Sequence, residues 1–279
     1  MNLCLENVNF AYPANPEKNI LSEINLSIKK GELLGIIGKT GAGKSTLLQL
    51  CAGLLYPTEG AVEIDKRKLF GQKDWKNYRK KIGLVFQFPE KQLFEETVFK
   101  DVAFGLQRSN GKAENLKELV YQSLEKVGMS PDIYAQRSPH QLSNGEQRKI
   151  AIAGIIASDP EILFLDEPTM GLDYRSSSEI EKLVRNLHDR DKTVCVVSHN
   201  LDFVARISNR IIVLDRGKII YDGSSDDLFY NDIKLKELSL GKPEIVSICE
   251  EVSKLTDIKI QGVFSINDLI ELLNNRNFS

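Results

Sequence analysis

Histidine and cysteine are scarce in this sequence, and their scarcity excludes several kinds of site. The 279 residues include 3 histidines and 4 cysteines, and no Cys-x-x-C pair occurs. Clusters of these residues at short spacing build zinc sites and disulfide frameworks. The sequence predicts neither. We expect unpaired, buried side chains in a reducing compartment at Cys4, Cys51, Cys195 and Cys249.

The chain also lacks an excess of charge of either sign. Lys and Arg total 37 against 39 Asp and Glu, which leaves a formal net charge of −2. Non-specific nucleic-acid binders and polybasic membrane anchors carry a basic excess, so the chain as a whole belongs to neither class. We therefore expect no nucleic-acid partner, although the total leaves room for a local basic patch.

Long hydrophobic runs are missing as well. The longest apolar run, residues 150–157, is well under half of the ~20 residues that a membrane-spanning helix needs. The N-terminus carries no basic segment ahead of an apolar one, as a secretory signal would. With 42% hydrophobic residues the composition is ordinary for a globular protein. Without a membrane span or a secretory signal, we expect the protein in the cytoplasm. At ~100–200 residues per domain, the length predicts one large domain, alone or with a smaller one.

What the sequence does contain is a series of short strand patterns. Alternating apolar residues predict strands at 3–10 and 20–28, and continuous apolar runs predict buried strands at 33–37, 161–165 and 193–197. Runs of the second kind are typical of parallel strands covered on both faces. Apolar helical segments lie between these runs, so the pattern favours an α/β fold.

The loop after the strand at 33–37 carries the clearest motif. Residues 38–45 fit G-x-x-x-x-G-K-[ST] between a strand and an apolar helix, the context of a phosphate-binding loop. Glycines let backbone N–H groups point at phosphate oxygens, and the helix adds its positive dipole end. Lys44 is predicted to reach the β- and γ-phosphates and Ser45 to bind Mg²⁺. A plain glycine-rich connector is the alternative. The predicted ATP-binding residues are Gly38, Lys39, Thr40, Gly41, Ala42, Gly43, Lys44, Ser45 and Thr46.

Polar residues also follow the two later buried strands. The strand at 161–165 ends in Asp166 and Glu167, and the strand at 193–197 leads to His199. Because parallel strands end at one edge of a sheet, these residues should lie beside the phosphate loop. Asp166 is predicted to hold Mg²⁺, Glu167 to be the general base toward water, and His199 to contact the γ-phosphate region. The alternatives are a loop-capping carboxylate pair and a structural histidine.

A further motif lies between these strands. Residues 142–147 read Leu-Ser-Asn-Gly-Glu-Gln and precede an apolar helix. With this segment the chain resembles the ATP-binding subunits of ABC transporters, whose L-S-G-G-Q signature opens such a helix. The resemblance covers residues 1 to about 230. In order it comprises the phosphate loop, the Q-loop residue Gln87, the signature, Asp166 and Glu167 of Walker B, Asp173 of the D-loop, and His199.

The resemblance implies roles for residues outside the phosphate loop. Tyr12 resembles the aromatic residue that stacks on adenine, with packing at a strand end as the alternative, and Gln87 resembles the family's metal and water contact. In the family, the signature meets the γ-phosphate held by a partner subunit. One chain then holds two half-sites and needs a second ATPase subunit, in a homodimer or a heterodimer. The residues implied to act on the partner's ATP are Leu142, Ser143, Asn144, Gly145 and Glu146.

Two signature residues depart from the family pattern. Asn144 replaces a glycine and Glu146 replaces a glutamine. Asparagine adopts a left-handed conformation more readily than other non-glycine residues, so we expect the loop to keep its shape. Glutamate resembles a tolerated variant. Asn144 bears on the catalytic strength of the partner's site, whereas Walker B and His199 are intact, so the chain's own half-site is expected to be catalytic.

The stretch after Gln87 narrows the resemblance. Residues 86–98 and 101–105 are similar to the Q-loop region of energy-coupling factor (ECF) ATPases, and the chain is most like the second ATPase subunit of ECF heterodimers. This implies a Mg²⁺-dependent ATP hydrolase at the cytoplasmic face of the membrane. The implied partners are a transmembrane coupling subunit and a substrate-binding membrane subunit. The implied task is to power the uptake of a vitamin or a transition metal. Leu93 and Phe94 either face the coupling subunit or belong to the helical core.

The C-terminal tail has its own helical pattern. Apolar residues predict a helix near 245–255 and a second from Ser265 onward. Two short amphipathic helices cannot bury their apolar faces alone, so they should pack on the main domain or on a partner's tail. By resemblance, residues 241–279 form a dimerisation element. Residues 1–240 form an α/β P-loop NTPase with an antiparallel β subdomain and an inserted α-helical signature subdomain at about 88–157.

Three alternatives within the wider family are open. ATPases of other ABC transporters share these motifs. Soluble ABC proteins of DNA repair carry long coiled-coil insertions between Walker A and the signature, where only residues 44–141 intervene in this chain. Those of translation carry two ATPase domains in one chain, for which 279 residues leave no room. The third alternative is a non-catalytic scaffold that only binds nucleotide.

Overall fold

A central sheet organises the chain, and its order brings distant segments together. The computed structural model describes residues 1–110, 115–189, 192–256 and 258–276. The sheet has the strand order β10-β9-β3-β8-β7-β6, in which only β10 is antiparallel to its neighbour. Its strands are β3 (Leu33–Ile37), β6 (Ile82–Val85), β7 (Ile162–Asp166), β8 (Thr193–Val197), β9 (Arg210–Asp215) and β10 (Lys218–Ser224).

The inner strands of this sheet are buried on both faces. All residues of β3, β7 and β8 are buried, as expected for parallel strands with layers on either side. Along β7, Leu163 and Leu165 join one apolar cluster, whereas Ile162 and Phe164 join the other. The continuous apolar runs in the sequence therefore reflect two cores that share one sheet.

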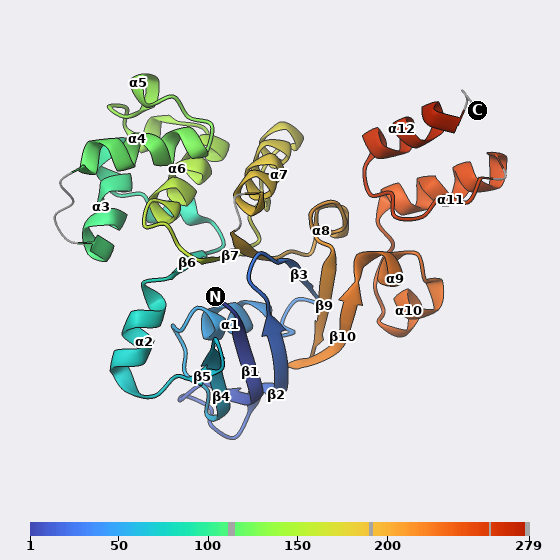
Figure 1. Cartoon of the computed structure of the whole chain (residues 1–279), viewed down its shortest axis with the longest axis horizontal. Helices are drawn as coiled ribbons and strands as arrows, with labels where there is room; N and C mark the ends of the chain where they lie inside the picture. The colour runs from blue at the N-terminus through green and yellow to red at the C-terminus, as the bar shows by residue number, and fades with distance from the viewer. Residues whose placement is uncertain (111–114, 190–191, 257, 277–279) are drawn as a thin grey trace.

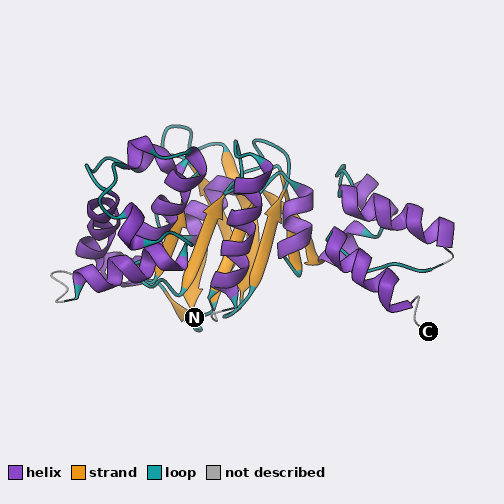
Figure 2. Ribbon diagram, turned by 90° about the horizontal axis from the view of Figure 1, so that it is seen from above, coloured by secondary structure: helices purple, strands orange, loops and turns teal. Residues whose placement is uncertain are grey.

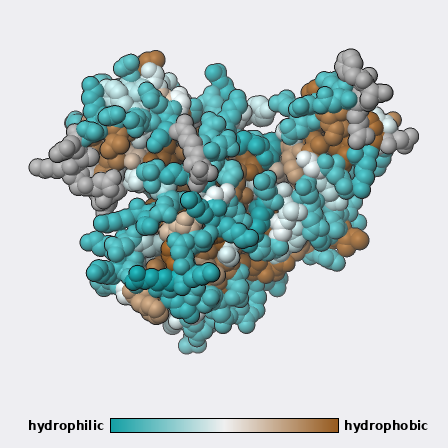
Figure 3. All heavy atoms as spheres, viewed as in Figure 1, coloured by the Kyte–Doolittle hydropathy of each residue, from teal (hydrophilic) through white to brown (hydrophobic). Residues whose placement is uncertain are grey.

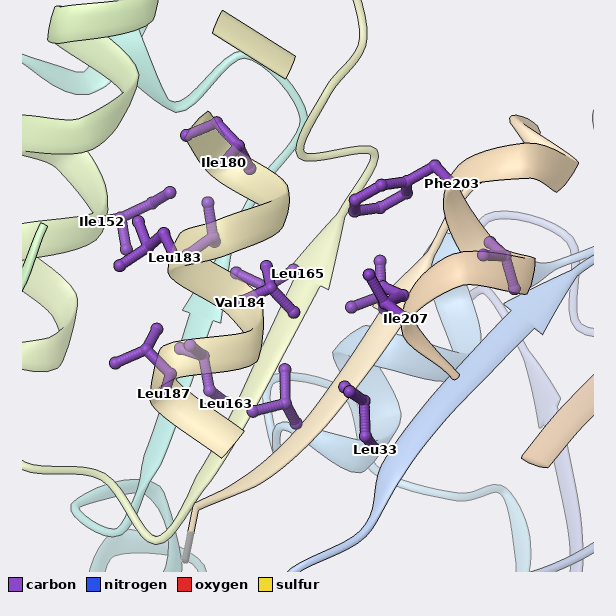
Figure 4. Packing of buried hydrophobic residues seen from close by; sticks show 14 of the residues in the cluster. Leu33, Ile152, Leu163, Leu165, Ile180, Leu183, Val184, Leu187, Phe203 and Ile207 are labelled. Carbon is purple, nitrogen blue, oxygen red and sulfur yellow. The ribbon is translucent and has the colours of Figure 1, made fainter. Parts of the chain in front are cut away.

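Helices cover one face of the sheet. Figure 4 shows α7 (Tyr174–His188) alongside β7, with Val184 of the helix next to Leu165 of the strand, and Ile180 belongs to the same cluster. The helix α8 (Leu201–Ile207) adds Phe203 to the same cluster. Truncating a buried leucine in such a core to alanine costs about 2–5 kcal/mol of stability.

The other face carries a small antiparallel sheet and the helix of the phosphate loop. The sheet has the order β2-β1-β4-β5 and confirms the predicted β subdomain. Its inward side chains share a core with α1 (Lys44–Cys51). Its strands are β1 (Leu3–Ala11), β2 (Asn19–Ile28), β4 (Glu59–Ile64) and β5 (Arg67–Lys68), and α2 (Gly71–Arg79) leads from it to β6.

A group of helices is inserted between β6 and β7, as predicted. Figure 1 shows it at one end of the central sheet, in green and yellow-green. The short 3-10 helix η1 (Pro89–Gln92) leads into it, and Leu93 is buried there while Phe94 is exposed. The other elements are α3 (Val98–Asn110), α4 (Leu116–Lys126), α5 (Pro131–Tyr134), the 3-10 helix η2 (Pro139–Gln141) and α6 (Asn144–Ile156).

The last described part of the chain is a further group of helices, here called the C-terminal arm. These are α9 (Ser225–Phe229), α10 (Asp232–Glu237), α11 (Glu244–Thr256) and α12 (Ile266–Arg276). Figure 2 shows them beside the sheet rather than over it. The Tyr230 hydroxyl donates to the Val263 carbonyl at 2.7 Å, and Val246 and Cys249 of α11 are buried in the same apolar cluster as Phe203 of α8. The segment before α12 thus packs on the end of α9, and the Ile245 N–H at the start of α11 donates to Asp202 Oδ1 of α8 in the main domain at 3.3 Å.

Two further findings bear on the compartment and the membrane. The cysteines are unpaired, with Cys51, Cys195 and Cys249 buried and Cys4 partly exposed. Within the described parts of the chain, no helix has both the length and the apolar character to cross a bilayer.

Candidate active site

The predicted site residues meet at the carboxyl edge of the central sheet. In the ladder, Ile36 of β3 and Asp166 of β7 both lie beside Val197 of β8. The loops that follow these strands enclose a cleft of about 460 Å³. Its lining consists of Ile20, Thr40, Gly41, Gly43, Lys44, Ser45, Thr46, Gln87, Asp166, Glu167, Met170 and His199.

Backbone geometry shapes the phosphate loop on one side of the cleft. Gly38 has a φ of +151°, and a Cβ there would lie 2.1 Å from the Leu214 carbonyl oxygen, so only glycine fits. The Lys44 ammonium donates to the carbonyls of Gly38 at 2.7 Å and Lys39 at 3.0 Å. Burial lowers the pKa of Lys44, partly opposed by the nearby carboxylates. The cation is thus held inside the loop, ready for an anion.

Asp166 and Ser45 bring oxygen ligands to the floor of the cleft. The Asp166 carboxylate is 7% exposed. Burial raises its pKa, while a hydrogen bond from the Ser45 side chain acts in the opposite direction. A hydroxyl, a carboxylate and the Gln87 amide form an oxygen set of the kind that Mg²⁺ prefers alongside phosphates. A buried carboxylate with a raised pKa gains from a cation, so these residues fit Mg²⁺.

Glu167 is held by the strand next to its own. Its carboxylate oxygen Oε2 accepts hydrogen bonds from the Ser198 hydroxyl at 3.0 Å and the His199 backbone N–H at 3.3 Å. The same oxygen lies 2.9 Å from His199 Nδ1. Glu167 is 8% exposed and has a φ of +49°, which is uncommon for a non-glycine residue. The structure therefore joins the predicted base and the predicted histidine directly.

Two lining residues, Ile20 and Met170, were missed by the sequence interpretation. Ile20 reads as core of a strand, and Met170 as an apolar residue between Walker B and the D-loop. The Gln87 amide nitrogen lies 2.8 Å from the Met170 sulfur. No residue-type signal marks either one, because a cleft is lined by whatever side chains its loops present.

Tyr12 lies beside the cleft rather than in its lining. It follows β1, and its hydroxyl is 3.2 Å from Thr46 Oγ1 at the start of α1. Its ring packs edge-on against Phe10, with centroids 5.0 Å apart. The side chain is 39% exposed. The ring is thus fixed near the phosphate loop with part of its surface free for a base.

The signature residues form a second, separate feature. Ser143 caps α6 in a capping box: its side chain accepts from the Glu146 N–H, and its backbone N–H donates to Glu146 Oε2 at 2.9 Å. The Ser143 hydroxyl also donates to Glu146 Oε2, at 2.7 Å. Tyr134 donates to the other oxygen of Glu146 at 2.9 Å. These bonds, led by that from Ser143, lower the pKa of Glu146. Gly145 packs so closely that a Cβ would lie 2.7 Å from Ser176 Oγ.

The remaining signature and D-loop residues are regular in conformation. Asn144 is the first residue of α6 and has no positive φ, so the left-handed tolerance of asparagine is not needed there. Asp173 caps α7 and accepts from the Ser176 N–H at 2.8 Å. Residues 142–146, all of which the structure describes, lie outside the cleft lining. The cleft and the signature are thus two separate features of the structure.

Comparison with known proteins decides the family. The profile of the ABC transporter family matches residues 21–170, more than half of the chain. The chain belongs to this family. Among curated ABC relatives, the energy-coupling factor transporter ATP-binding protein EcfA2 of Caldanaerobacter subterraneus is 45% identical over 258 residues, covering 91% of this chain and 90% of the relative. EcfA2 of Clostridium perfringens is 38% identical and covers 99% and 100%. Within the ABC family, the chain is of the ECF type.

Solved ABC structures show the same architecture. CbiO1 of Clostridium perfringens, described as part of the ABC transporter complex cbiONQ, has a TM-score of 0.76 and 31% identity and covers 92% of this chain and 98% of its own. The ATP-binding cassette MJ0796, a dimer in a post-hydrolysis state bound to ADP and phosphate, has a TM-score of 0.71 and 32% identity over 80% and 98%. The ABC fold and an ATP hydrolase activity follow.

Proposed function

We propose that this ECF-type ABC ATPase binds and hydrolyses ATP to power an importer through partner membrane subunits. The observation that carries the proposal is the meeting of Lys44, Asp166 and Glu167 with the phosphate loop at one sheet edge. Two ATP molecules would lie between this chain and a second ATPase subunit, either a copy or a different chain. Each would contact the cleft of one subunit and the signature of the other.

The cleft residues divide the work of binding. Lys44 and the backbone N–H groups of the phosphate loop bind the β- and γ-phosphates. Ser45, Asp166 and Gln87 would hold Mg²⁺, which when bound neutralises charge on the phosphates. Tyr12 stacks on adenine, a contact worth about 1–3 kcal/mol per base. Binding exchanges the Lys44 bonds to backbone carbonyls for bonds to phosphate.

Glu167 and His199 carry the chemical step. Glu167 orients a water and takes its proton while the water oxygen attacks the γ-phosphorus. The bond from the γ-phosphorus to the bridging oxygen breaks, and ADP leaves with that electron pair. His199, joined to Glu167 through Nδ1, keeps the carboxylate in place and faces the γ-phosphate. The signature of the partner subunit completes the site.

A surface next to Gln87 suits a membrane partner. Phe94 is 58% exposed and lies edge-on to Phe104, with ring centroids 4.9 Å apart. Acidic residues Glu95 and Glu96 follow directly. We assign this apolar-acidic surface to the transmembrane coupling subunit, so the ATPase works at the cytoplasmic face as a peripheral subunit. A separate substrate-binding membrane subunit would choose the vitamin or transition metal.

The C-terminal arm is the proposed dimerisation element. Its helices leave apolar residues exposed, with Leu255 85% and Ile270 50% exposed. Figure 3 shows hydrophobic residues gathered over this arm. A second ATPase subunit would cover them.

Purification of the native assembly tests this function. The chain is tagged at its N-terminus, extracted with mild detergent, and its co-purifying proteins are identified. A second ATPase with two membrane subunits of the coupling and substrate-binding kinds is the expected result. Membrane subunits of another ABC class, or no membrane protein at all, would contradict the ECF assignment. ATP turnover of the assembly separates a working ATPase from a scaffold.

A further inference from the structure

Arg148, on the signature helix α6, is a buried cation with a full set of partners. Its side chain is 1% exposed. Nε and Nη2 donate to the Glu90 carboxylate at distances between 3.0 and 3.2 Å, in a fork geometry. Nη1 donates to the backbone carbonyls of Pro168 at 3.0 Å and Met170 at 2.8 Å. A buried guanidinium is stable only when its charge is paired and its N–H groups are hydrogen-bonded, as they are here.

These contacts join three segments that are far apart in the sequence. Arg148 lies five residues after the signature serine, Glu90 lies in η1 just after Gln87, and Pro168 and Met170 follow Glu167. One planar group therefore touches the signature helix, the Q-loop segment and the loop of the proposed base.

The loop of the proposed base needs to be held. Glu167 has a positive φ, and such a conformation in a non-glycine residue persists only where its surroundings fix it. The Met170 N–H donates to the Glu167 carbonyl at 3.2 Å and closes a turn. Arg148 binds the Pro168 carbonyl inside that turn and the Met170 carbonyl at its end. Ser198 and His199 hold the Glu167 carboxylate itself. Arg148 thus fixes the backbone side of Glu167.

We propose that Arg148 is a positioning residue for Glu167, with Glu90 as the group that orients its guanidinium. A shift of α6 or of the Q-loop segment would move the guanidinium and, through the two carbonyls, the base. The helical subdomain would then set the geometry of hydrolysis without touching nucleotide. This inference rests on the proposed role of Glu167.

The test uses Arg148→Lys in the purified transporter complex, with the partner ATPase subunit silenced so that only this chain's cleft turns over. Lysine keeps the charge but cannot bind the carboxylate and two carbonyls at once. We expect kcat to fall about tenfold to a hundredfold, as for a small misplacement of a reacting group. The KM for ATP and the Kd for a non-hydrolysed analogue should stay within about threefold, because no phosphate contact is lost.

Combination with Glu167→Gln separates positioning from general damage. If Arg148 acts through Glu167, Arg148→Lys should lower the residual turnover of Glu167→Gln by less than about twofold. Lys149→Gln is the matched control: it breaks the ion pair of the next residue on α6 with Glu179, and kcat should not change.

Glu90→Gln provides a second variant if Arg148→Lys does not fold. It keeps the shape of the partner, and kcat should fall by a smaller factor with the same unchanged ATP affinity. Wild-type turnover, a loss carried by KM, or a loss that multiplies in full onto Glu167→Gln would overturn the inference. Full activity of Glu167→Gln alone would instead overturn the proposed function.

Discussion

The cleft and the region of the signature and D-loop differ in how their charged side chains are stabilised. In the cleft, burial raises the pKa of Asp166 and lowers that of Lys44. At the signature and the D-loop, hydrogen bonds from Ser143 and Ser176 lower the pKa values of Glu146 and Asp173. Burial therefore disfavours the charged forms of Asp166 and Lys44, whereas hydrogen bonds stabilise the charged forms of Glu146 and Asp173.

This difference indicates that the cleft, and not the signature, gains stability from a bound ligand. Phosphates and Mg²⁺ would relieve the buried charges of the cleft, so binding there is coupled to stability. The signature helix N-terminus is occupied by the carboxylate of its own Glu146. In the proposed dimer, a phosphate held by the partner would share that end of the helix with a negative charge.

The largest effect is expected in the cleft from Glu167→Gln. The amide keeps the shape of the side chain but cannot accept a proton, and general-base catalysis contributes about 10²–10⁴-fold. Turnover should fall by that factor while ATP binding is retained and a closed dimer accumulates. Turnover and size-exclusion chromatography with ATP measure both. Glu125→Gln, on an exposed position of α4, is the control; full activity of Glu167→Gln would remove the assigned base.

Asp166→Asn tests the buried charge of the cleft. Burial places the pKa of folded Asp166 above its ordinary value, so in that window the folded chain binds more protons, and the free energy of unfolding falls as the pH rises. At neutral pH the carboxylate thus destabilises the nucleotide-free chain. We expect Asp166→Asn to raise the Tm by a few degrees, to erase the extra stabilisation from Mg²⁺ with ATP, and to abolish turnover.

The pH dependence of Tm is the check on this sign. Below the ordinary pKa of aspartate the wild-type group is protonated in both states, so the two proteins should differ less. A variant that is less stable than wild type at neutral pH, without nucleotide, would contradict the electrostatic description of the cleft.

Tyr12→Ala tests the edge of the cleft. Loss of base stacking, about 1–3 kcal/mol, should raise the Kd for ATP roughly fivefold to a hundredfold with little change in kcat. Tyr12→Phe keeps the ring and removes only the contact with Thr46, so it should bind nearly as wild type. Fluorescence titration with labelled ATP measures both variants. If Tyr12→Ala binds ATP as tightly as the wild type does, Tyr12 only packs at the end of the strand and does not stack on adenine.

The smallest effect is expected at the signature from Glu146→Gln. Glutamine retains the capping box but removes the charge from the helix N-terminus. Helix-terminus charges are worth about 0.3–1 kcal/mol, so turnover at the partner's cleft should rise about twofold to fivefold. Turnover of the complex with this chain's own cleft silenced isolates that site. Unchanged or lower turnover would show that Glu146 does not compete with the phosphate.

The sequence predicted the cleft because its signals are local. A phosphate loop, a carboxylate pair after a buried strand and a histidine after another each occupy a few consecutive residues, and parallel strands bring them to one edge. The inserted helical subdomain and the antiparallel sheet followed from the family resemblance and are confirmed. Phe94, left between surface and core, is exposed, while Leu93 is buried.

Long-range contacts were beyond the sequence. Arg148 reads as one more charged residue on a polar helix face, because nothing local shows that Glu90 and two carbonyls surround it. The bond between Glu167 and His199 depends on the register of β7 against β8. The packing of the segment before α12 on the end of α9 depends on contacts such as Tyr230 with Val263, which no periodicity reveals.

The central claim is that the two halves of this chain serve different ATP molecules. It is tested by counting the phosphate released per complex in a single turnover. Only this chain carries the substitutions, and the other ATPase subunit, either a distinct chain or a separately tagged copy, is unmodified. Glu167→Gln silences this chain's cleft and Ser143→Ala silences its signature.

If the halves serve different nucleotides, each single variant leaves one intact site and the complex releases about half of the wild-type phosphate, while the double variant in one chain releases almost none. If both halves act on the same nucleotide, the double variant releases as much as either single variant, and the two-half-site arrangement is wrong.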